Sequence, residues 1–137
     1  MATNPKVFSF IGVQPMSDLE LATQTEKGFP LATIENLKKH GLTFTEIAGS
    51  IISPRTLKHR KTRQEPLSSV ETERVVRVAR MVELAEQVFG SREKAFLWLR
   101  SPDERLNDRT PIQMLVNEPG GRLVESMLWQ IDEGIYA

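Results

Sequence analysis

The chain has 137 residues, with 18 Lys and Arg, 18 Asp and Glu, two His and no Cys. This length predicts one domain or two very small ones, and 39% hydrophobic residues suffice for a buried core. The lack of cysteine excludes disulfides, thiol catalysis and thiolate zinc sites. No apolar run approaches the ~20 residues of a membrane-spanning helix, and we expect no signal peptide because a basic patch with an apolar core is missing at the N-terminus.

The net charge of zero hides an uneven distribution. Residues 55–63 carry five Lys or Arg and no acidic residue, whereas residues 81–137 carry six basic and ten acidic residues. Separate basic and acidic regions favour two surfaces with different partners.

The N-terminal segment, residues 1–27, is predicted to be irregular. It shows no sustained hydrophobic period, and Asn4-Pro5, Gly12 and Pro15 interrupt it. A short strand over residues 7–13 is the only regular element that this segment suggests.

The next segment predicts a helix-turn-helix. Leu31, Ile34 and Leu37 recur with helical spacing before Gly41. Thr43 and Glu46 then form a capping box that starts a second helix, which runs to about Ile51. Ser53-Pro54, an N-cap followed by proline at the first helical position, starts a third helix over residues 54–62, and this helix carries the basic block.

The longest periodic segment follows. Ser68 and Glu71 form a second capping box, and apolar residues then recur at alternating spacings of three and four up to Gly90. Because the apolar face is broad, we expect this helix to bridge two halves of the protein. Beyond it we expect only short helices over residues 91–100, 112–116 and 119–133, and no sheet.

A string of separated motifs runs through the C-terminal half: Leu84-Ala85-Glu86-Gln87-Val88-Phe89-Gly90, Glu93-Lys94-Ala95, Trp98-Leu99, Arg109-Thr110-Pro111, Met114-Leu115, Gly121, Val124, Leu128, Ile131 and Gly134. Looser matches extend upstream to Gly28. In this order the motifs resemble the Xre/MbcA/ParS class of antitoxins. Where members of this class often have a Gly pair, the chain has Asn107-Asp108, which tolerate the same turn geometry.

The resemblance implies an all-α fold, in which a Cro/Xre-like helix-turn-helix domain is joined by a long helix to a small helical toxin-binding domain. We assign residues 28–80 to the DNA-binding domain and residues 81–137 to the toxin-binding domain. The resemblance further implies a cytoplasmic antitoxin that blocks a cognate RES-type, NAD-degrading toxin, represses its own operon by binding operator DNA, and self-associates as a homodimer or larger assembly. The alternative is a stand-alone helix-turn-helix regulator or partition-type adaptor without a toxin.

The basic block supplies the candidate DNA-binding residues. Five cations are expected to neutralise phosphates: Arg55, Lys58, Arg60, Lys61 and Arg63. Arg55, Thr56 and His59, near the helix start, are expected to reach base edges in the major groove. Five phosphate contacts would give a slope of log K against log salt near ~ −4.5. The alternative is a basic helix that is simply solvated.

The last helix supplies the candidate toxin-binding residues. Its polar and aromatic side chains off the apolar stripe are Glu125, Trp129, Gln130, Asp132 and Glu133. Trp is enriched at interface hot spots, although Trp129 could equally be a partly buried core residue. An acidic side chain here, or Tyr136 with the carboxylate of Ala137, would meet the basic residues with which a nucleotide-cleaving toxin holds pyrophosphate.

Catalysis is not expected. Asp103-Glu104 is a paired carboxylate, but it lies in a Pro-Asp-Glu turn where solvent should surround both groups. The sequence has no Gly-rich phosphate loop, no metal-spaced His/Asp cluster and no recognisable nucleophile. We therefore predict no enzyme activity, no cofactor and no metal.

Overall fold

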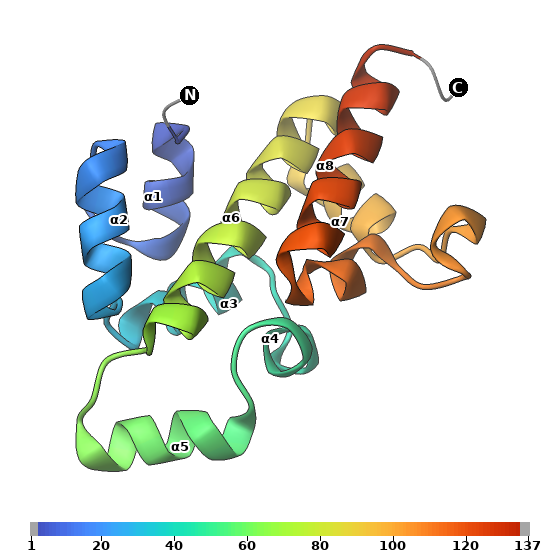
Figure 1. Cartoon of the computed structure of the whole chain (residues 1–137). Helices are drawn as coiled ribbons and strands as arrows, with labels where there is room; N and C mark the ends of the chain where they lie inside the picture. The colour runs from blue at the N-terminus through green and yellow to red at the C-terminus, as the bar shows by residue number, and fades with distance from the viewer. Residues whose placement is uncertain (1–2, 135–137) are drawn as a thin grey trace.

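The computed structural model describes residues 3–134, and within them the chain is all-α (Figure 1). The helices, in chain order, are α1 (Pro5–Ile11), α2 (Asp18–Lys27), α3 (Ala32–His40), α4 (Phe44–Ser50), α5 (Pro54–Arg63), α6 (Ser69–Phe89), α7 (Arg92–Leu99), the 3₁₀ helices η1 (Glu104–Leu106) and η2 (Pro111–Val116), and α8 (Glu118–Asp132). None of the helices within this described range combines the length and apolar composition that crossing a bilayer requires.

The helix starts confirm the predicted caps. Thr43 and Ser68 each accept the backbone N–H of the residue three positions on, and the Glu carboxylate at that position accepts the N–H of the capping residue. Ser53 caps α5, with Pro54 at its first position. Gly90 ends α6 in the left-handed conformation, with φ of 81°.

The prediction for residues 1–27 is wrong, because α1 and α2 occupy most of this segment. The Asn4 side chain caps α1, and a capping box between Ser17 and Glu20 starts α2. The suggested strand is also wrong, since Val7, Phe8 and Ile11 lie on one buried helical face. Helix α1 is short, and tertiary packing stabilises it more than helix propensity does.

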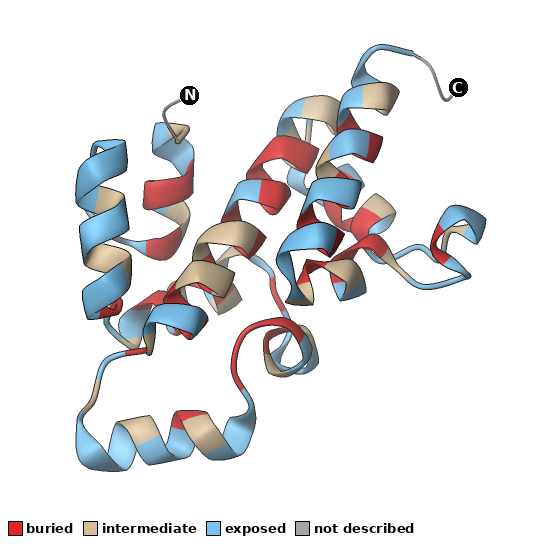
Figure 2. Ribbon diagram, in the orientation of Figure 1, coloured by how far each residue is buried: buried red, intermediate tan, exposed pale blue. Residues whose placement is uncertain are grey.

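Helix α6 forms the centre of the molecule, as its broad apolar face predicts. Val75, Val78 and Ala85 are fully buried. Helices α1, α2 and α3 pack on one side of α6, and α7, α8 and η2 pack on the other (Figures 1 and 2). The helix therefore joins the two halves through one continuous core.

The beginning and end of the helix-turn-helix segment meet at the start of α6. The backbone N–H of Phe29 donates to Thr72 Oγ1 at 2.9 Å, and the N–H of Leu67 donates to the carbonyl of Phe29 at 2.9 Å. Gly28 has a φ of 93°, and a Cβ there would lie 1.9 Å from the Leu67 carbonyl oxygen. Only glycine fits this crossing of the two segments.

Candidate functional site

Helix α5 presents a basic face to solvent. Leu57 is its buried residue, and Figure 1 shows the helix standing apart from its neighbours with a loop at each end. The exposed side chains of the predicted DNA-binding set are Arg55, Lys58, His59, Lys61 and Arg63. Figure 2 accordingly shows α5 as mostly exposed. This is the arrangement that a helix entering a DNA groove needs.

Arg60 was predicted to contact phosphate, but in the structure it is paired with carboxylates of the protein itself. Its Nε and Nη2 each donate to a different oxygen of Glu71 at 3.2 Å, and its Nη1 donates to Glu65 at 3.2 Å. Burial alone would raise the pKa of Glu71, but Arg60 and the N–H of Ser68 outweigh burial and lower that pKa. Arg60 is therefore bound within the protein, and four of the five cations remain directed to solvent.

Thr56 is also partly buried. Ser53 Oγ donates to its hydroxyl at 2.9 Å, and its backbone N–H donates back to Ser53 Oγ. Its side chain thus belongs to the helix cap more than to the outward face.

The turn between α4 and α5 is held by apolar burial. Ile51 and Ile52 are both buried there, and Arg74 of α6 donates to the carbonyl of Ile51 at 3.3 Å. These contacts fix the start of α5, although the turn itself, Ile51-Ile52-Ser53, contains no glycine.

Helix α8 buries one side and offers the other. Val124 and Leu128 are fully buried, whereas Trp129 is 44% exposed. Asp132 and Glu133 are exposed, and Glu125 and Gln130 are half-buried. Tyr136 and Ala137 lie outside the described residues. The predicted toxin-binding side chains that the structure describes therefore gather on the outer side and at the end of α8.

A pocket of about 240 Å³ adjoins Trp129. Its lining includes Met81 and Leu84 of α6 and Val7 of α1. The N-terminal helix thus contributes to the surface around Trp129. Sequence reasoning missed this contribution, although the Ser17–Glu20 capping box was a signal that the N-terminal segment is folded.

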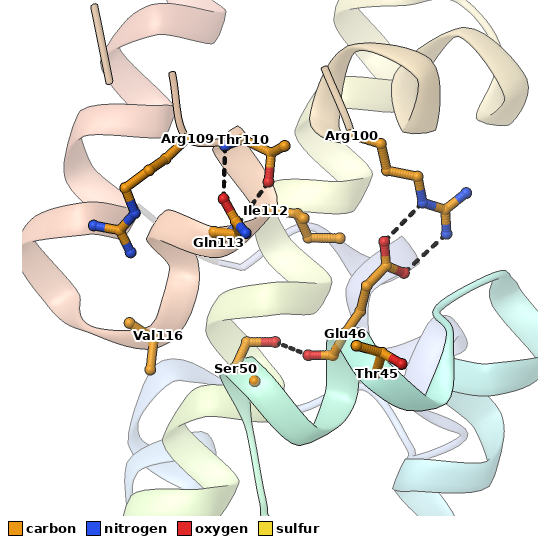
Figure 3. Close-up of a pocket in the computed structure, with 10 residues that line it drawn as sticks. Thr45, Glu46, Ser50, Arg100, Arg109, Thr110, Ile112, Gln113 and Val116 are labelled. Atoms are coloured by element: carbon orange, nitrogen blue, oxygen red, sulfur yellow. Dashed lines mark hydrogen bonds and ion pairs between the residues drawn. The ribbon is translucent and has the colours of Figure 1, made fainter. Parts of the chain in front are cut away.

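A second pocket, of about 500 Å³, lies between α4 and η2 (Figure 3). At one side Arg100 makes a two-pronged ion pair with Glu46, at 2.7 and 2.9 Å, and also donates to the carbonyl of Gly41 at 2.8 Å. Burial raises the pKa of Glu46, but Arg100 and the N–H of Thr43 lower it further than burial raises it. The cap of α4 is thereby tied to the C-terminal half.

The two carboxylates of Asp103-Glu104 differ in their surroundings, since Glu104 is exposed and Asp103 is paired. Asp103 accepts from the backbone and guanidinium of Arg105, and this hydrogen bonding lowers its pKa. Asp103 is half-buried, whereas the sequence predicted that solvent would surround it. Asn107 and Asp108 have φ of 56° and 65°, which confirms the turn geometry expected of them. Among residues 3–134, no three His, Asp or Glu side chains gather so as to hold a metal ion.

Both halves of the chain match models of known protein families. Residues 20–80 match the model of the antitoxin Xre-like helix-turn-helix domain, and residues 84–134 match that of the antitoxin Xre/MbcA/ParS C-terminal toxin-binding domain. Antitoxin Xre of Pseudomonas putida is 41% identical over 118 residues, which are 86% of this chain and 74% of the relative. Antitoxin Xre of Yersinia enterocolitica is 29% identical over 87 residues, 63% of this chain and 59% of the relative.

The fold also has a solved counterpart. A chain in the crystal structure of the M. tuberculosis MbcT-MbcA toxin-antitoxin complex superposes with a TM-score of 0.56 at 19% identity, covering 89% of this chain and 100% of that chain. This similarity supports the fold alone.

Proposed function

Because the chain belongs to the Xre/MbcA/ParS family of antitoxins, we propose that it neutralises a RES-type, NAD-degrading toxin and represses its own operon by binding operator DNA. Members of this family are antitoxins and not enzymes. The proposal includes action in the cytoplasm and self-association as a homodimer or larger assembly. One observation carries it: a helix-turn-helix unit and a toxin-binding unit lie side by side in one chain.

The DNA-binding part of the proposal is supported by the outward face of α5. Arg55, Lys58, Lys61 and Arg63 face solvent there, and His59 lies among them. Cations on one face of a helix that follows a fixed turn neutralise phosphates and place side chains near base edges.

The toxin-binding part is supported by the outer side of α8. Trp129 offers apolar area, and Asp132 and Glu133 offer negative charge beside it. A toxin that holds a dinucleotide pyrophosphate needs basic residues, and carboxylates are their natural partners. In this proposal Tyr136 and Ala137 extend the same contact.

The toxin-binding part is tested by co-expressing the chain with the protein encoded beside its gene. We expect growth and cellular NAD to be preserved and the two proteins to co-purify. A chain that ends at Leu128 should lose this protection, whereas Arg55→Ala, on the opposite functional unit, should keep it. Protection by the shortened chain would contradict the proposed interface, and failure to find a toxin partner would favour a stand-alone regulator.

The DNA-binding part is tested by titrating the promoter fragment of its own gene at several salt concentrations. With four solvent-facing cations, the slope of log K against log salt should be near ~ −3.6. Lys58→Ala should make it shallower by about 0.9, whereas Lys94→Ala on α7 should leave it unchanged. Affinity that does not vary with salt would contradict the proposal.

A further inference from the structure

Helix α5 has few apolar contacts for a helix that must be aimed accurately. Of its ten residues, Leu57 is the buried one. A helix with one buried side chain is held weakly by packing, so its orientation depends on its other contacts. A second, directional contact is needed to determine which side chains face outward.

The ion pair between Arg60 and Glu71 supplies that contact. The planar guanidinium binds both carboxylate oxygens at 3.2 Å, an arrangement with strong geometric specificity. Glu71 is only 8% exposed, and it also accepts the N–H of Ser68 at 2.8 Å. The carboxylate is therefore fixed to the first turn of α6, the central helix of the core.

We propose that Glu71 is a positioning residue for DNA recognition, because through Arg60 it sets the rotation of α5 and so directs Arg55 and His59 toward the bases. This inference rests on the proposed DNA binding. Glu71 itself does not touch DNA. It acts by holding the helix that does.

The proposal predicts an unusual direction for the change in DNA affinity when the negative charge of Glu71 is removed. Removing a carboxylate from the neighbourhood of a DNA-binding surface ordinarily strengthens binding, because repulsion of the phosphates decreases. Here the same change should weaken binding, because it releases α5. A purely electrostatic role and a positioning role thus predict opposite results.

The experiment compares Glu71→Gln with Glu73→Gln, which removes the same charge two residues further along α6. Gln also serves in a capping box, so the start of α6 is retained. The probes are a duplex carrying the promoter of its own gene and a duplex of unrelated sequence. We expect Glu71→Gln to weaken promoter binding about tenfold, through misplaced base contacts, with a smaller effect on the unrelated duplex. Glu73→Gln should bind at least as tightly as the unmodified protein.

Two further variants separate positioning from direct contact. Arg60→Ala should lower promoter affinity without changing the salt slope, since Arg60 neutralises no phosphate. Arg60→Lys keeps the positive charge but cannot make the two-pronged contact with Glu71, so it should lower promoter affinity to a similar degree. Amide hydrogen exchange should be faster in α5 of Glu71→Gln while the core of α6 remains protected, which shows that the variant is folded.

Results that contradict the positioning role differ from the result that contradicts DNA binding itself. Promoter affinity of Glu71→Gln equal to or above that of the unmodified protein overturns the positioning role, as does a salt slope shallower by about 0.9 in Arg60→Ala. Failure of the unmodified protein to bind the promoter overturns the proposed DNA binding itself.

Discussion

Helices α5 and α8 carry the two proposed binding surfaces but are held in different ways. Helix α5 buries only Leu57, whereas α8 buries Gly120, Gly121, Val124, Met127 and Leu128. The first relies on a cap and an ion pair at its ends, and the second on close packing against α6 and η2. Binding residues on α5 can therefore change with little effect on the core, while those on α8 adjoin it.

The largest expected effect is a difference in how much stability the protein loses when one buried leucine is removed from α8 or from α5. Leu128→Ala should lower the free energy of unfolding by about 4 kcal/mol, because a fully buried side chain leaves a cavity in packed surroundings. Leu57→Ala should cost about 2 kcal/mol, since the loops beside α5 can collapse around the gap. Urea unfolding measures both values, and equal losses would remove the distinction between the helices.

Trp129 tests whether the partly exposed side of α8 acts in binding. Trp129→Ala should weaken toxin binding by about 2 kcal/mol, as for a hot-spot residue, while lowering stability by less than about 1 kcal/mol. Isothermal titration calorimetry measures the affinity. The matched control is Leu97→Ala, an apolar residue of α7 that is 71% exposed and outside the proposed interface. Similar losses for the two variants would contradict a specific role for Trp129.

The smallest effect concerns the connection between the halves. Because the folded-state pKa of Glu46 is lowered from 4.5, its pairing with Arg100 stabilises the protein above about pH 4.5, and this stability is lost as the pH falls through the folded-state pKa. The contribution should be below about 1 kcal/mol, since Arg100 is partly exposed. Unfolding curves from pH 7 to 3 should show a flatter dependence in Glu46→Gln. An unchanged dependence would show that the pair does not link the halves energetically.

Features that depend on neighbouring residues were predictable from the sequence. The capping boxes at Thr43 and Ser68, the Ser53-Pro54 start and the stop at Gly90 each require only a few adjacent residues, and all four are confirmed. The broad apolar face of α6 likewise indicated its central place. For α1, however, the apolar signal was only seven residues long, and Gly12, which looked like an interruption, is the left-handed C-cap that ends the helix.

Features that depend on distant residues were not predictable. Glu46 and Arg100 are 54 positions apart, and no periodicity connects them. Arg60 looks like its basic neighbours in sequence, and only the fold shows that it faces Glu71 instead of solvent. A charge count identifies a basic helix but does not indicate which of its cations are already paired.

The meeting of residues 28–29 with Leu67 and Thr72 has an evolutionary consequence. The bond between Phe29 and Thr72 closes a loop of chain spanning 43 positions, and the entropic cost of closure rises by only about 0.6 kcal/mol for each doubling of loop length. Insertions beside α5, or replacement of its outward side chains, therefore change the loop while its two ends remain joined. Under the proposed function, such changes would alter which DNA is bound and leave the surface of α8 unchanged.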